Sequence, residues 1–213
     1  MAESAVLEST DVEPVDRRVS PAAHLSEQFA AAEVTGARGV SLREVPFQAM
    51  VGVRVVPGSA VAERVEAQLG AALPATCGSV SQGSGVGSDA SVLWLSPDEF
   101  LVVADGDSAA LTDLLVEAVA SGPGSATDLS ANRTTFELTG PSARDVLEKG
   151  CSLDLHPRAF AVGAAYLTAL GSVPVVLWQT DVESYRILPR SSFADFLGRW
   201  LLDAMAEYRA PEL

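Results

Sequence analysis

Two stretches of the chain, about 83 residues apart, carry the same sequence signals in the same order. In each, an apolar run ends at a turn with Pro and Gly and is followed by residues that suit a helix, in residues 53–60 and 136–143. A second apolar run ending in Trp follows at nearly the same offset, in residues 92–94 and 176–178. These matching landmarks indicate an internal duplication. Each copy is expected to hold a strand, a helix, two or three strands and a second helix, which predicts an α+β fold of two related α/β subdomains.

The predicted division of the chain follows from this duplication and from local composition. Residues 1–19 are rich in Glu, Asp, Ser and Val without periodicity, and we expect an acidic flexible arm. Residues 20–122 are predicted to form the first α+β subdomain and residues 123–213 the second, because Gly and Pro in residues 121–124 interrupt the pattern. Residues 77–90 are rich in Gly and Ser, which predicts a mobile loop. This loop lacks the Lys and the following helix of a phosphate-binding loop.

Local signals in the first copy predict where several elements begin and end. Ser20 and the Pro after it suit the start of a short helix over residues 20–34. Residues 45–56 are nearly alternating and predict one strand. Apolar residues four apart in residues 61–69 predict a helix that ends near Gly70.

The second copy gives a denser set of signals. Residues 133–139 alternate and predict a half-buried strand, and Pro141 suits the first turn of the helix that follows. Gly150 is expected to end this helix in a left-handed turn, since it has no Cβ. Ser192 is expected to cap a long final helix with one apolar face.

Composition bounds the class of protein. A chain of 213 residues with 48% hydrophobic residues is long enough for one large or two small domains with a core. No apolar run approaches the roughly 20 residues that cross a bilayer, and no secretory signal is recognisable, so a cytoplasmic location is expected. The net charge of −14 disfavours nucleic acid and anionic membranes as partners. Cys77 and Cys151 lie far apart without a metal-ligand spacing and are expected to be free thiols.

Few residues are candidates for chemistry. Asp128, Ser130 and Arg133 cluster before a predicted strand, where Arg133 could bind a carboxylate, or where Asp and Ser could stabilise a turn through backbone amides. His156 is expected to hold a loop or to contact a subunit or cofactor, and Arg158 lies beside it. No motif for a nucleophilic serine, a zinc protease or a nucleotide loop is present, so no catalytic, cofactor-binding or metal-binding residue is predicted.

Two consecutive motifs carry a family resemblance. G-P-S-A-R-D-V-L-E-K-G-C spans residues 140–151, and L-D-L-H-P-R-A-F spans residues 153–160. With the D-L-S turn at residues 128–130, they resemble the gamma subunit of heterotetrameric sarcosine oxidase. Thinner similarity in segments from residue 20 onward extends this resemblance roughly over residues 20–208. The G-P-x-A followed by a helix is also similar to the folate-binding region of the glycine-cleavage T-protein, so that part is shared by a superfamily.

The resemblance implies an accessory, non-catalytic subunit of a tetrahydrofolate-dependent sarcosine oxidase. Such an enzyme oxidatively demethylates sarcosine to glycine, with the one-carbon unit passed to folate or released as formaldehyde, and forms hydrogen peroxide. The implied partners are larger flavoprotein alpha and beta subunits and a small zinc-binding delta subunit, which would hold FAD, FMN, NAD, zinc and tetrahydrofolate. This chain is expected to bind no cofactor and to be inactive alone. The alternative is a freestanding folate-binding one-carbon transferase of T-protein type.

Overall fold

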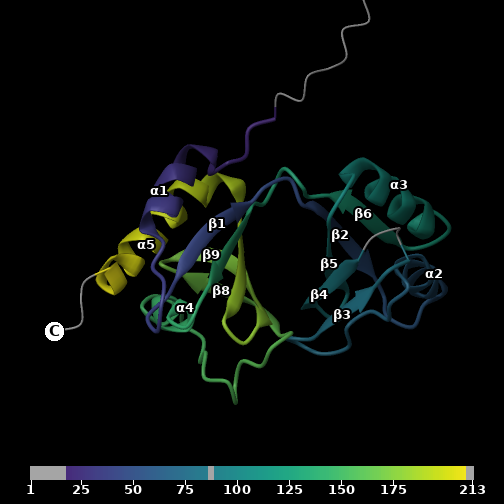
Figure 1. The fold of residues 1–213 in the computed structure, drawn as a ribbon. Coiled ribbons are helices and arrows are strands. Elements are labelled where there is room, and N and C mark those ends of the chain that lie inside the picture. The colour runs from purple at the N-terminus through teal and green to yellow at the C-terminus, as the bar shows by residue number, and fades with distance from the viewer. Residues whose placement is uncertain (1–17, 86–88, 210–213) are drawn as a thin grey trace, which may run out of the picture.

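The computed structural model describes residues 18–85 and 89–209; most of the predicted arm at residues 1–19 therefore lies outside the described residues. Two antiparallel five-stranded sheets pack against each other, and helices cover their outer faces (Figure 1). The order of layers is therefore helices, sheet, sheet, helices. This confirms the prediction of an α+β fold with two related halves.

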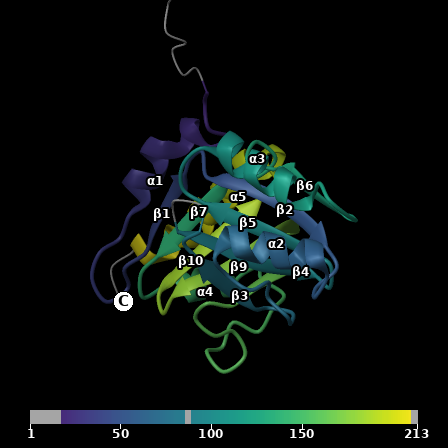
Figure 2. The ribbon, with the colours of Figure 1, turned by 90° about the vertical axis from the view of Figure 1, so that its right-hand side faces the viewer.

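The first sheet has the strand order β3-β4-β5-β2-β6. Its strands are β2 (Ala49–Val55), β3 (Val80–Gly83), β4 (Ala90–Ser96), β5 (Glu99–Ala104) and β6 (Gly124–Asp128). Helices α2 (Ala60–Leu69) and α3 (Ser108–Val119) lie over its outer face, as Figure 2 shows. Their buried apolar residues form one core with this sheet.

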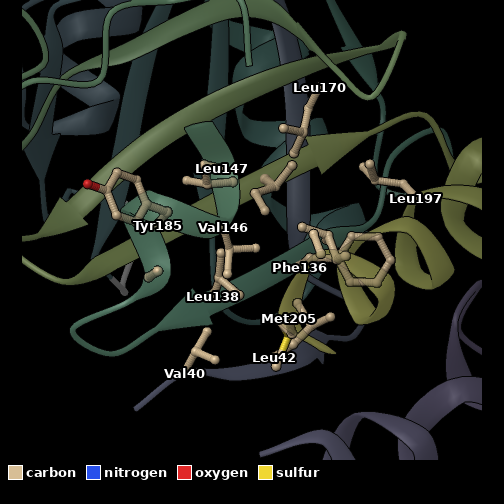
Figure 3. Close-up of a cluster of buried hydrophobic side chains, with 14 of the residues drawn as sticks. Val40, Leu42, Phe136, Leu138, Val146, Leu147, Leu170, Tyr185, Leu197 and Met205 are labelled. Atoms are coloured by element: carbon tan, nitrogen blue, oxygen red, sulfur yellow. The ribbon is translucent and has the colours of Figure 1, made fainter. Parts of the chain in front are cut away.

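The second sheet has the order β1-β7-β10-β9-β8. Its strands are β1 (Ser41–Val45), β7 (Thr135–Thr139), β8 (Ala165–Leu170), β9 (Val173–Asp181) and β10 (Ser184–Pro189). Its helices are α1 (Ser26–Ala32), α4 (Ala143–Glu148) and α5 (Ala194–Met205), with short 3₁₀ turns at Ala23–Leu25, Ser191–Phe193 and Ala206–Arg209. Side chains from β1, β7, α4 and α5 converge in the core beneath it (Figure 3).

The two sheets exchange their first strands. The chain order β1-β2-α2-β3-β4-β5-α3 is repeated as β6-β7-α4-β8-β9-β10-α5. In each repeat the first strand pairs in the other sheet: β1 pairs with β7, and β6 pairs with β2. Each sheet therefore contains strands from both predicted subdomains. Strand β1, from residues 20–122, lies in the second sheet, and β6, from residues 123–213, lies in the first sheet.

The central strands are buried on both faces, which explains their continuous apolar runs. In β5, Phe100 and Val102 point to the helices, whereas Leu101 and Val103 point to the other sheet. The same alternation occurs in β9, where Val176 faces the first sheet. A buried cluster thus joins the two sheets face to face.

Several helix ends follow the sequence signals, and others do not. Gly70 ends α2 with a φ of 66°, and the Ser59 hydroxyl caps its start by accepting from the Ala62 amide at 3.2 Å. The expected left-handed turn at Gly150 is wrong, because this glycine does not have a positive φ. Instead, a Cβ at Gly150 would lie 2.5 Å from the Trp200 ring, so the glycine is needed for close packing.

The expected caps at Ser20 and Ser192 are also wrong. The Ser20 hydroxyl donates to Glu44 Oε2 at 2.6 Å, and the helical turns begin only at Ala23. The turn Ser191–Phe193 precedes the last helix, which has no side-chain cap. For Ser20, a tertiary contact with Glu44 takes the hydroxyl away from the helix start.

Two expectations for the first copy need correction. The single strand predicted over residues 45–56 is divided between β1 and β2 by a turn in which Phe47 has a φ of 58°. The predicted loop over residues 77–90 contains strand β3, which pairs with β4. At Gly83 of β3, a Cβ would lie 2.2 Å from the Leu69 carbonyl oxygen. The glycine therefore allows this strand to approach the end of α2 closely.

Candidate functional site

A pocket of about 360 Å³ lies where the chain crosses between the sheets. One wall is the β1–β2 connection, and another is the β6–β7 connection, which also carries three of the predicted candidate residues. The two connections are tied together, because the Leu129 amide donates to the Met50 carbonyl at 2.8 Å. Its lining residues are Arg18, Val19, Pro21, Val45, Phe47, Gln48, Met50, Ser108, Asp128, Ser130, Ala131, Arg133, Thr134, Thr135 and Ser191.

Asp128 and Ser130 fix the β6–β7 connection. The Asp128 carboxylate accepts from the Ser130 amide at 2.8 Å, and the Ser130 hydroxyl accepts from the Met50 amide at 2.9 Å. These are the bonds of a turn held by Asp and Ser side chains, the second of the two readings of this motif. The Asp128 side chain thus shapes this turn, and the Ser130 side chain holds it against the start of β2.

Together with Arg18, Arg133 is one of the two arginines that line the pocket. Its Nη1 donates to the Leu188 carbonyl at 2.8 Å, so the guanidinium is held against the end of β10. Burial and the neighbouring positive charge of Arg190 lower the pKa of Arg133, and Glu99 acts in the opposite direction. Among residues 18–85 and 89–209, no carboxylate lies within ion-pair distance of this guanidinium.

Two further polar groups of the pocket were not recognised in the sequence. Gln48 Oε1 and Thr135 Oγ1 are buried, and neither has a hydrogen-bond partner in the described part of the chain. Gln48 Nε2 donates to Asp105 at 3.2 Å, so only its oxygen is unused. Buried polar atoms normally have partners, so these two oxygens are available to a ligand that donates hydrogen bonds. Neither residue type nor spacing gives a signal for them.

The rim of the pocket carries local backbone strain. Phe47 has a left-handed φ although it has a side chain, and that side chain is 45% exposed. The Arg18 guanidinium lies 4.9 Å from the centre of its ring. Strained backbone often occurs next to binding sites, which is a second reason to regard this pocket as the candidate site.

His156 and Arg158 lie elsewhere, in the exposed connection between α4 and β8. The His156 amide donates to Asp154 Oδ1 at 2.9 Å, and His156 Nδ1 accepts from the Arg158 amide at 3.2 Å. The imidazole thus holds a turn of this connection, and the structure does not bring it to the pocket.

The described residues include two cysteines, and their His, Cys, Asp and Glu side chains are of the types that bind metals. Within residues 18–85 and 89–209, no group of three or more His, Cys, Asp or Glu side chains is arranged to hold a metal ion. Cys77 is exposed and Cys151 half-buried, and both are free thiols, as predicted. No helix in the described part of the chain has the length and apolar character needed to span a bilayer.

Comparisons with a family model and with known sequences point to the same family. The model of the sarcosine oxidase, gamma subunit family matches residues 55–207. The chain is 47% identical over 213 residues to sarcosine oxidase subunit gamma of Corynebacterium sp. (strain U-96), with 100% of both chains covered. It is 46% identical to the corresponding subunit of Arthrobacter sp, covering 99% of this chain and 98% of that relative.

Two solved structures share the fold. A chain of the heterotetrameric sarcosine oxidase from Corynebacterium sp. U-96, in complex with pyrrole 2-carboxylate, is 48% identical with a TM-score of 0.86; the match covers 92% of this chain and 98% of that one. The glycine cleavage system aminomethyltransferase T from Bartonella henselae has a TM-score of 0.63 at 17% identity, covering 85% of this chain and 56% of that one. The second likeness concerns the fold alone.

Proposed function

Because the chain belongs to the sarcosine oxidase gamma subunit family, we propose that it is an accessory, non-catalytic subunit of a heterotetrameric, tetrahydrofolate-dependent sarcosine oxidase. The observation that carries the proposal is the likeness, over nearly its whole length, to one chain of a heterotetrameric sarcosine oxidase. In this proposal the assembled enzyme oxidises the N-methyl group of sarcosine with O₂ as acceptor. Glycine and hydrogen peroxide are formed, and the one-carbon unit passes to folate or leaves as formaldehyde.

The non-catalytic role is supported by what the polar residues of the pocket already do. Asp128 is engaged in a turn of the β6–β7 connection, Ser130 in a bond to the start of β2, and Arg133 is anchored to a backbone carbonyl. A residue that must transfer protons or attack a substrate needs a free reactive group at a suitable pKa. Following the family resemblance, we assign FAD, FMN, NAD, zinc and tetrahydrofolate to partner subunits, namely larger alpha and beta flavoproteins and a small zinc-binding delta subunit.

Purification through a tag on this chain tests the assignment. Expressed together with the genes of candidate partners, the chain is expected to bring down three further polypeptides of unequal size and a flavin spectrum. The same complex prepared without this chain should assemble poorly and lose sarcosine-dependent peroxide formation. Normal assembly and activity without the chain would contradict an accessory role, and a colourless single chain would contradict the oxidase assignment.

The exposed connection with His156 and Arg158 is our proposed contact with a partner subunit. It lies in one of the two motifs that are similar to the family, and its own bonds already shape it. Arg158→Ala is expected to reduce recovery of the other polypeptides, whereas Arg144→Ala, on the exposed face of α4, should not. Equal recovery with both variants would contradict this contact.

A second candidate function is a freestanding folate-binding one-carbon transferase of T-protein type. It is favoured by the T-protein-like fold and by the pocket between the two halves. Titration of the purified full chain with 5,6,7,8-tetrahydrofolate distinguishes the two functions. Tight binding together with transferase activity of the single chain would support the second function and contradict a non-catalytic role.

A further inference from the structure

A second pocket, of about 480 Å³, lies on the other side of Arg133. It is formed by the ends of strands from both sheets, and Arg133 borders both pockets. Its remaining lining residues are Leu95, Glu99, Leu167, Thr168, Pro174, Val175 and Arg190. The pocket therefore combines two guanidinium groups with apolar side chains on part of its wall, beside the polar Glu99 and Thr168.

The two arginines are held side by side by the backbone. Arg133 and Arg190 form an antiparallel β-bridge, so their side chains leave the backbone in the same direction. One nitrogen of each is anchored: Arg133 Nη1 donates to the Leu188 carbonyl at 2.8 Å, and Arg190 Nη1 donates to Asn132 Oδ1 at 2.9 Å. The remaining N–H groups of each guanidinium are left to bind other acceptors, since arginine has five donors.

No carboxylate of the described residues forms an ion pair with either of these two arginines. Neither guanidinium has an acidic partner within ion-pair distance in residues 18–85 and 89–209. Glu99 also lines the pocket, but its carboxylate accepts from Arg54 Nη2 at 2.7 Å. The chain has 28 acidic and only 14 basic side chains, so two adjacent unpaired arginines are contrary to its overall composition.

Like charges in a partly buried place destabilise each other, and burial adds to the cost. Burial and Arg190 lower the pKa of Arg133, and Glu99 raises it by less, so the net direction is that expected for a positive charge without an anion in contact. A bound anion between the two guanidinium groups would remove this cost, and a carboxylate matches the planar fork of arginine.

The apolar residues that line the pocket indicate which kind of substituent is attached to the anion. Leu167 is 53% exposed at the pocket, and Leu95 and Pro174 also line it. We propose that this second pocket binds a monocarboxylate with an apolar substituent, its carboxylate between Arg133 and Arg190 and its substituent against Leu167. The carboxylate belongs either to a free organic acid or to a side chain or C-terminus of a partner subunit.

The test begins with the purified full chain and the probe 4-methylpentanoate. Binding is followed by NMR through the Nε–H signals of the arginines. Saturable shifts are expected for Arg133 and Arg190, with weaker binding of acetate, which lacks the apolar substituent, and no binding of the neutral 4-methylpentanamide. Arg190→Gln should weaken binding about tenfold or more, because a charge-assisted hydrogen-bond pair is lost.

Arg144→Gln serves as the matched control, since it removes one positive charge from an exposed helix face and should leave the affinity unchanged. Arg190 is exposed, so the Arg190→Gln variant is expected to fold. Arg133→Gln is a second variant. Because the Arg133 guanidinium bonds to the end of β10, the melting temperature of this variant is measured as a check on folding. Absence of saturable shifts, equal binding of the amide, or unchanged affinity in Arg190→Gln would overturn the proposal.

The source of the carboxylate is decided with the chain in its co-purified complex. Binding of 4-methylpentanoate to both the free chain and the complex would identify a free organic acid as ligand. Binding to the free chain alone, together with weaker assembly of Arg190→Gln, would identify a partner's carboxylate. The measurement on the free chain does not depend on the proposed oxidase function, so failure of one can be told from failure of the other.

Discussion

Replacement of Glu44 in β1 tests how the N-terminal segment is attached to the second sheet. Its carboxylate accepts from the Ser20 hydroxyl at 2.6 Å, from the Thr134 hydroxyl at 2.5 Å and from the Ala22 amide at 3.1 Å. The Thr134 and Ala22 residues are buried. The Glu44 carboxylate therefore connects Ser20 and Ala22, the edge strand β1 and the residue before β7.

The expected loss of stability in Glu44→Ala follows from the hydrogen-bond donors that are left without an acceptor. Two buried donors, the Ala22 amide and the Thr134 hydroxyl, lose their acceptor, and each unsatisfied buried group costs about 1–3 kcal/mol. The adjoining groove can admit water, since Ser20, Ala22 and Glu44 line an open pocket of about 530 Å³. We expect a loss of about 2–4 kcal/mol in the free energy of unfolding. Glu44→Gln keeps one acceptor oxygen and should lose about 1–2 kcal/mol.

Urea unfolding followed by tryptophan fluorescence measures these losses, with the same slope in urea expected for all variants. A double-mutant cycle with Thr134→Val isolates the bond between the two side chains, and a coupling of about 1 kcal/mol or more is expected. Glu27→Gln, on the exposed face of α1, is the control and should change stability by less than about 0.5 kcal/mol. A loss below about 1 kcal/mol for Glu44→Ala, or no coupling to Thr134, would refute the reasoning.

Three further changes test the packing and the electrostatics. Gly140→Ala should lower the free energy of unfolding by about 2 kcal/mol or more, because this position has a φ of 115° and a new Cβ would lie 2.5 Å from a backbone carbonyl oxygen. Gly58→Ala is the control: its φ is 75° and the space around it is open, so the loss should be only about 1 kcal/mol. Chemical denaturation measures both losses. Phe136→Ala should cost about 3–5 kcal/mol in the same assay, because the ring is fully buried (Figure 3), whereas Phe196→Ala, 54% exposed, should be nearly neutral. Burial and the adjacent carboxylate raise the pKa of Tyr208 to about 12, so its contribution to stability is complete below its unfolded pKa of about 10 and is lost as the pH rises through about 12. Tyr208→Phe should remove the latest phenolate transition from an alkaline absorbance titration; an unchanged titration would show that another tyrosine is responsible.

The duplicated order of elements could be predicted from the sequence because its signals are local. The helix over Ala60–Leu69 was recognised from apolar residues one turn apart and from Gly70, whose left-handed φ needs no tertiary contact. Central strands were recognised because burial on both faces requires an unbroken apolar run. The Asp128–Ser130 turn is equally local, since its carboxylate bonds an amide two residues on.

Glycine accounts for two of the wrong expectations. Composition alone predicted a mobile loop over residues 77–90, yet Gly83 lies in a strand that packs against the end of α2. Gly150 likewise makes room for a tryptophan ring and does not form a left-handed turn. A glycine required for close approach looks the same in sequence as one required for flexibility, because the neighbour that demands the space lies far away in the chain.

The pairing of the edge strands could not be predicted for a related reason. The strand Ser41–Val45 is short and half-exposed, and its side-chain pattern fits the edge of either sheet. Its partner strand Thr135–Thr139 begins directly after Thr134, which bonds to Glu44 across a sequence separation of 90 residues. Only the tertiary structure reveals that it continues the sheet of the other repeat.

This exchange of strands also explains where the candidate site lies. Each repeat sends its first strand into the other sheet, so the chain must cross between the sheets twice, at residues 45–49 and 128–135. The two crossings meet and bond to each other, and their side chains line the pocket that contains Gln48 and Arg133. A cut between residues 122 and 123 would leave each half without the edge strand it receives and would remove one wall of that pocket. The site is therefore a property of both repeats together, and its residues become neighbours only when both sheets have formed.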